Sequence, residues 1–255
     1  GTNLYVADQA NHRIRKIALR EKTSHLTLHN LDDDFPATPK ISITGLLSNS
    51  GTLSVQNSEF TLSGGASLAG GSFDLTGTKF IVSDNLTKTG GTITANTATL
   101  KLNQSLSIVS NDGLTFQDLD LNNSNLTLGS ATTDLTISNA VTMDNSTEKI
   151  NTGSASLTLS GGLTLTDGDV EANGGTISLG NTSTVANDGT IDVSGGTLVL
   201  NSSLSVLGTL KTNNSTILTL NNNALDLSGG QSATGGALEA GGALNLDGIT
   251  FDDKT

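Results

Sequence analysis

Short aliphatic runs that begin with Gly, Ser or Thr recur along most of this chain at intervals of roughly 20 residues. They begin at Gly51, Gly71, Gly91 and Gly113, and again at Ser154, Gly175, Gly196, Thr216 and Gly236. The spacing does not fix the register between the two series, near residues 132–137. A repeat of this length cannot bury its apolar residues alone, so successive repeats must stack on one another. The recurrence therefore predicts a solenoid.

Each repeat divides into three short runs in which apolar and polar residues alternate. In residues 197–211 the apolar side carries Leu198, Leu200, Leu204, Val206 and Leu210. Alternation with a period of two is typical of strands with one buried face. Small polar corners separate the runs, and Asn and Gly tolerate the left-handed conformations that corners require.

We therefore expect an all-β fold, a parallel three-faced β-solenoid (β-helix), over residues 41–255. It would have about ten coils of 20–22 residues and a length of about 50 Å, since neighbouring strands lie about 4.8 Å apart. An antiparallel sandwich of hairpins is the alternative, because short strands separated by turns also suit it. Hairpins need no long-period register, so the spacing favours the solenoid.

The composition limits both the core and the partners. Aromatic residues make up 3% of the 255 residues, and Cys and Trp are absent, so aliphatic side chains must fill the interior without disulfides. The net charge of −12 divides into +1 for residues 1–40 and −13 for residues 41–255. An acidic rod repels phosphates, so we expect no nucleic acid partner. No apolar run is long enough for a membrane span.

Residues 3–17 read NLYVADQANHRIRKI and differ in kind from the repeats. They resemble a single NHL repeat, the blade unit of a β-propeller, and this implies a short β-hairpin over residues 1–20. A propeller needs several complete blades, so no ligand site is implied. The acidic run at 32–34 and the prolines at 36 and 39 indicate a linker over residues 21–40.

Two interpretations of this N-terminal segment stay open. It is the closing fragment of a propeller, or it is an assembly arm that docks on a neighbouring surface. The candidate arm residues are Tyr5, Val6, His12, Arg13 and Ile14.

The repeats lack the residues that most catalytic sites use. All His and all Arg precede residue 30, so we expect no enzymatic activity and no catalytic, cofactor or metal site. A carbohydrate-active β-helix enzyme would instead need paired carboxylates. The candidate groups, which we interpret as solvent-facing, are Asp118/Asp120, Asp167/Asp169/Glu171 and Asp252/Asp253.

The outward side of one strand in several repeats carries paired hydroxyls. The pairs are Thr52/Ser54, Thr92/Thr94, Ser156/Thr158 and Thr176/Ser178, and Asp74, Val199, Ile217 and Glu239 interrupt the series. The pattern resembles the Thr-x-Thr ladders of ice-binding solenoids, which implies a flat surface able to contact ice. Thr is also frequent on strands because of its β-propensity, so the pattern has a purely structural interpretation as well.

The Gly, Thr, Leu and Asn style of residues 41–255 is similar to the β-solenoid stalks of bacterial secreted adhesins, of the haemagglutinin-like or autotransporter passenger type. This resemblance implies an extracellular or cell-surface structural or adhesive role, within a large surface protein. We expect the partners to be surface glycans or further copies of the chain, joined through the solenoid ends and the N-terminal arm into a filament. The chain has nine Asn-x-Ser/Thr glycosylation sequons, among them Asn85 and Asn125. Such sequons arise by chance in a chain rich in Asn and Ser, so they do not distinguish between these functions.

Overall fold

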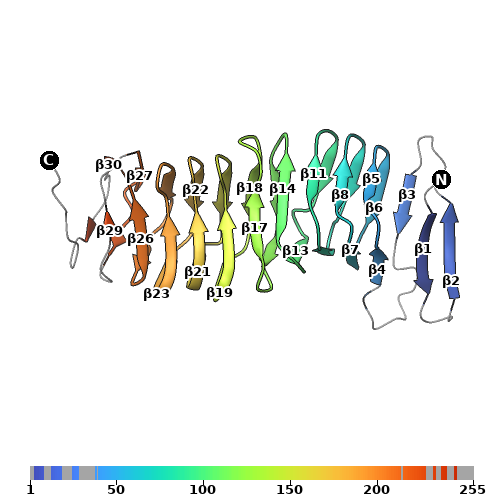
Figure 1. The fold of residues 1–255 in the computed structure, drawn as a ribbon, viewed down its shortest axis with the longest axis horizontal. Coiled ribbons are helices and arrows are strands. Elements are labelled where there is room, and N and C mark those ends of the chain that lie inside the picture. The colour runs from blue at the N-terminus through green and yellow to red at the C-terminus, as the bar shows by residue number, and fades with distance from the viewer. Residues whose placement is uncertain are drawn as a thin grey trace.

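The chain forms a rod of stacked β-coils in the computed structural model (Figure 1). The structure describes residues 38, 40–213 and 215–227, together with the backbone of strands at 3–8, 13–18, 25–28, 232–233, 237–239 and 244–245. Within these residues it is all-β, with parallel strands stacked as a β-solenoid of about nine turns. The predicted fold class is confirmed, at about one turn fewer than the expected ten.

Three faces make up each turn of the first part of the rod. The first face contains β4 (Lys40–Ile43), β7 (Glu59–Leu62), β10 (Lys79–Val82), β13 (Thr99–Leu102) and β16 (Asp118–Asp120). The second face contains β5 (Leu47–Asn49), β8 (Ala66–Leu68), β11 (Leu86–Lys88), β14 (Leu106–Ser110) and β17 (Asn125–Leu128).

The third face is formed by two separate sheets. The first holds β3 (His25–Leu28), β6 (Thr52–Val55), β9 (Ser72–Asp74) and β12 (Thr92–Thr94). The second holds β15 (Leu114–Phe116), β18 (Asp134–Ile137), β20 (Ser156–Leu159), β22 (Thr176–Leu179), β24 (Thr197–Leu200), β27 (Ile217–Thr219) and β30 (Ala237–Glu239).

In the later turns the first two faces merge into long bent strands. These are β19 (Val141–Asn151), β21 (Leu163–Glu171) and β23 (Ser183–Asp192), followed by the shorter β25 (Leu204–Val206), β26 (Thr209–Thr212), β28 (Leu225–Asp226), β29 (Ser232–Ala233) and β31 (Leu244–Asn245). A register shift bends β19 against β21 after Met143. The beginning of β23 pairs with β25 and its end with β26, so one strand spans two faces.

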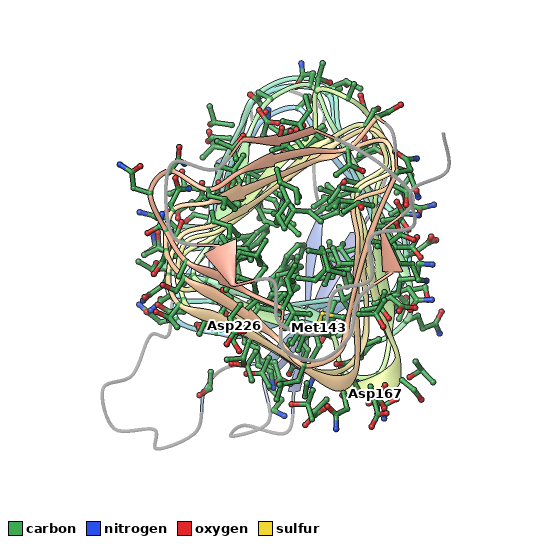
Figure 2. All side chains as sticks on the ribbon, turned by 90° about the vertical axis from the view of Figure 1, so that its left-hand side faces the viewer. Met143, Asp167 and Asp226 are labelled. Atoms are coloured by element: carbon green, nitrogen blue, oxygen red, sulfur yellow. The ribbon has the colours of Figure 1, made fainter. Side chains whose placement is uncertain are left out.

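The core is a continuous column of aliphatic side chains with one aromatic cluster. In-register pairing stacks Leu135, Leu157, Ile177 and Leu198 through four turns, and all four are buried. Phe73 contacts Phe60 and Phe80 edge to face, with ring centroids 6.0 and 5.8 Å apart. Figure 2 looks along the rod and shows Met143 inside the coils and Asp167 outside at a corner. Burial of the inward side chains on every turn supplies the main driving force for the fold.

The N-terminal segment forms strands next to the first coil. β1 (Asn3–Asp8) and β2 (Arg13–Ala18) pair in antiparallel fashion, and β1 lies beside β4. β3 falls inside the predicted linker range and pairs in parallel with β6. Of the candidate arm residues, Tyr5 and Val6 lie on β1, Arg13 and Ile14 lie on β2, and His12 lies outside the described residues.

Candidate functional site: the hydroxyl array of the third face

The seven-stranded sheet of the third face, which runs from β15 to β30, carries two columns of mostly hydroxyl side chains on its outward side. We name these two columns the hydroxyl array. Its members are Thr115, Thr136, Thr158, Ser178 and Thr219 in one column and Ser156, Thr176 and Thr197 in the other. Parallel pairing without register shifts aligns each column along the rod. The spacing is about 4.8 Å between turns and about 6.6 Å along a strand.

Strand alternation places these hydroxyls outside because their neighbours fill the core. Leu157 and Leu159 are buried on β20, whereas Ser156 and Thr158 on the same strand are partly exposed. Among the described residues, no hydrogen bond joins the side chains of Thr136, Thr158 or Ser178 to another protein group. Their hydroxyls therefore remain available to an external ligand or to water.

Residues without a hydroxyl group interrupt both columns of the array. Val199 stands in the first column between Ser178 and Thr219. In the second column Asp134 precedes Ser156, and Ile217, which is 45% exposed, follows Thr197. Both columns are therefore uninterrupted only on β20 and β22.

The predicted ladder is divided by the structure into two groups. Ser156, Thr158, Thr176 and Ser178 lie together in the hydroxyl array, whereas Thr52, Ser54, Thr92 and Thr94 lie in the separate four-stranded sheet. Sequence reasoning missed Thr115, Thr136, Thr197 and Thr219. The pairing of Leu135 with Leu157 supplies the register that the spacing near residues 132–137 left open.

In the four-stranded sheet, part of the hydroxyl set makes contacts within the protein. Ser72 Oγ donates to Thr52 Oγ1 at 3.2 Å, and Ser54 Oγ donates to Asp74 Oδ2 at 3.4 Å. Ser54 is only 7% exposed. Burial opposes ionisation of Asp74, but hydrogen bonds led by those from Thr76 hold the pKa of its carboxyl below the usual value. Asp74 therefore belongs to a cross-coil polar cluster.

The carboxylates considered for catalysis make cross-coil or local contacts. Asp118 accepts a hydrogen bond from Asn139 Nδ2 at 2.8 Å, and Asp120 forms an ion pair with Lys101. Asp167 accepts from the backbone N of Gly168 at 2.7 Å. Glu171 pairs with Lys149, and the Asp252/Asp253 pair lies outside the described residues. Asp118, Asp120, Asp167 and Glu171 thus each make a contact within the protein.

An ion-pair ladder crosses the first three turns of the first face. Glu59 lies 3.1 Å from Lys40 and 3.5 Å from Lys79. The hydrogen bond from Lys40, opposed by partial desolvation, lowers the pKa of Glu59. Such exposed pairs contribute little to stability individually.

The described part of the chain holds no group of three His, Cys, Asp or Glu side chains arranged to bind a metal ion. It also holds no helix with the length and apolar character of a membrane span.

Comparisons of the whole chain with protein-family models, curated proteins and solved structures give no significant match. The rod and its hydroxyl array are therefore the features of this chain that bear on its function.

Proposed function

We propose that this chain is a rod segment of an extracellular structural or adhesive protein, with the hydroxyl array as its contact surface. The supporting observation is the parallel, in-register stacking of β18, β20, β22 and β24. This stacking places a regular polar surface over the buried apolar core, and both the surface and the core extend along the rod. The interior is apolar except at isolated sites, so the outer faces are where a ligand or partner can be contacted.

Polysaccharide binding tests the adhesive part of this proposal. Hydroxyl pairs at a regular spacing suit a polymer that carries hydroxyls at a regular spacing, because each contact adds a weak hydrogen bond. We expect the full chain to bind surface glycans printed on a glycan microarray. We also expect it to sediment with insoluble polysaccharide.

A matched pair of variants locates the binding surface. Thr158→Tyr places a bulky ring in the array and should weaken binding at least tenfold. Thr127→Tyr places the same ring on the exposed side of β17, on the second face, and should leave binding unchanged. Tyr is favoured on strands, so both variants should fold. Equal binding by wild type and both variants would contradict a role of the array, and release of soluble sugar would favour the carbohydrate-active alternative.

The extracellular location is tested on intact producing cells. A surface-accessible chain should be cleaved by added protease and labelled by antibody before the cells are opened. A chain that becomes accessible only after lysis would contradict the proposal.

We also propose that copies of the chain associate end to end. Outer strands of a solenoid offer unpaired backbone groups that another strand can join. Within one chain β1 lies beside β4. If two copies exchanged their N-terminal arms, β1 of one copy would lie beside β4 of the other and would join the two chains. Native mass measurement and negative-stain imaging, with and without residues 1–20, test the association; monomers in both samples would contradict it.

Ice binding is a second candidate, and the register of the array favours it. Thr115, Thr136 and Thr158 occupy one column on consecutive turns. Thr115 and Thr136 thus extend the predicted ladder, to which Thr158 belongs, by two further turns. Thermal hysteresis that is abolished by Thr158→Tyr and retained by Thr127→Tyr would support this function. Absence of hysteresis in the wild type would exclude it.

A further inference from the structure

On the third face, one inter-coil boundary differs from the others. The first face has a break of its own one turn later, where its sheet ends at β16. The third face ends one sheet at β12 and begins another at β15, whereas the other two faces continue across the same boundary. On the first face β13 pairs with both β10 and β16, and on the second face β14 pairs with both β11 and β17. We name the break between β12 and β15 the seam.

Backbone groups on both sides of the seam lack the usual ladder partners. Thr92 N donates to Gly71 O at 3.0 Å and Thr94 O accepts from Leu75 N at 2.8 Å. Because alternate residues of a strand bond to opposite sides, the N–H and C=O of Ile93 face β15. Ile93 is half-buried, whereas its register partner Phe73 is buried.

The facing edge of β15 is unpaired in the same way. Ser138 N donates to Phe116 O at 3.0 Å, so the backbone groups of Phe116 face β18. Adjacent residues of a strand direct their backbone groups to opposite sides, so the N–H and C=O of Thr115 face β12. Within the described part of the chain, no backbone hydrogen bond joins β12 to β15. The two edges therefore face each other without a ladder.

A change in coil shape accounts for the seam. Before it, four-residue turns at Leu75–Thr78 and Ala95–Ala98 form the corner between the third and first faces, each closed by a backbone hydrogen bond of 2.8–2.9 Å. After it, the corner between the second and third faces gains such turns, at Thr152–Ala155 and Val193–Gly196, while Leu159–Gly162 and Leu220–Asn223 keep them at the corner between the third and first faces. At the seam itself, Gln117 alone separates β15 from β16.

The register steps record the same change. Leu86 pairs with Ile108 on the second face, and Thr99 pairs with Asp118 on the first face, so the step along the sequence is longer on the second face than on the first. The third-face strands on the two sides of the boundary belong to coils of different cross-section, so they do not meet in a ladder.

A buried lysine ties the corner next to the seam. Lys88 points inward from β11, between Leu68 and Ser110 of the adjoining turns, and its side chain is 2% exposed. Its ammonium forms an ion pair with Asp112 and lies 3.4 Å from Asn111 Oδ1. Asn111 also donates from its backbone N to Lys88 O at 3.2 Å. Side-chain contacts thus hold residues 111–112 to the preceding turn.

We infer that the seam is a joint at which the third face of the rod opens before it opens elsewhere. It divides the coils into an N-terminal block, β4–β13, and a C-terminal block, β14–β27. Opening the third face at this boundary breaks no backbone ladder, whereas opening it between β20 and β22 breaks a ladder of four residue pairs. The Lys88–Asp112 pair acts as the latch of this joint.

Hydrogen exchange on the full chain tests the joint. At pH 7 the amides of Ile93 and Thr115 should exchange at least a hundredfold faster than those of Thr94 and Thr136. Under increasing denaturant, peptides from residues 40–102 should become exposed together while peptides from residues 125–210 stay protected. Equal protection of Ile93 and Thr94, or loss of protection in both blocks at the same denaturant concentration, would overturn the inference.

Matched variants test the latch. Asp112→Asn should accelerate exchange at Ile93 and Thr115 at least tenfold. Asp120→Asn removes a similar ion pair, with Lys101, across the same boundary on the continuous first face and should leave these two amides unchanged. Equal effects of the two variants at Ile93 and Thr115, or no effect of Asp112→Asn there, would remove the latch from the proposal.

Discussion

Truncation of Phe73 should be among the most destabilising single changes in the rod. Its ring is 1% exposed and contacts two other rings, Phe60 and Phe80. Replacing a buried Phe by Ala costs roughly 3–5 kcal/mol through lost burial and the cavity left behind. Each edge-to-face ring contact adds about 0.5–1.5 kcal/mol beyond burial. We therefore place Phe73→Ala near the upper end of the truncation range, at about 5 kcal/mol.

Phe116→Ala is the matched control for this prediction. Phe116 is fully buried, and among the described residues its ring has no aromatic partner. Its truncation should cost about 1–2 kcal/mol less than that of Phe73, because only the burial and cavity costs apply. Urea unfolding followed by far-ultraviolet circular dichroism measures both, since the chain has no Trp. A cost for Phe73→Ala below about 2 kcal/mol, or equal costs for the two variants, would refute the assignment of the cluster as a stability centre.

Three further predictions follow from backbone and charge. Gly71→Ala should cost more than Gly195→Ala, because both glycines have positive φ but only at Gly71 would a Cβ overlap a backbone carbonyl of the preceding coil; urea midpoints of the two variants check this. Lys88→Met removes the latch and should speed local exchange at Ile93 and Thr115, but it should leave the global stability at pH 7 unchanged or raise it, because an apolar side chain of similar size replaces a buried charge; thermal unfolding measures the global change. The hydrogen bond from Lys88 lowers the pKa of Asp112, so the stability from ionised Asp112 is complete above the ordinary carboxyl pKa of about 3.9 and is lost as pH falls through the lower folded value. Lys88→Met should therefore reduce the loss of stability on acidification, and an identical acid profile for variant and wild type would contradict this.

Much of the fold could be predicted from local patterns. The alternation in TLVL at 197–200 indicates a strand with Leu198 and Leu200 inward, and the structure buries both. The recurrence from Gly51 to Gly71 and Gly91 predicts strands one turn apart, and β6, β9 and β12, which begin directly after these glycines, pair in parallel and in register. These features were readable because side-chain alternation and coil length are properties of consecutive residues.

The candidate site was only partly predictable. The hydroxyl pairs at 156–158 and 176–178 follow from strand alternation, and the structure aligns them. The membership of Thr115 and Thr136 depends on how irregular coils align near residues 113–137. That alignment is set by pairing with the turns on each side, which the spacing alone does not specify.

Local sequence patterns are enough to predict a parallel stack of short strands around an aliphatic core, because the same inward and outward alternation recurs from turn to turn. Three features could not be predicted in this way: the break of the third face between β12 and β15, the burial of Lys88 beside this break, and the set of hydroxyls that share one surface. These features depend on the fit between neighbouring coils of different shape, so they are properties of contacts between turns and of no single turn.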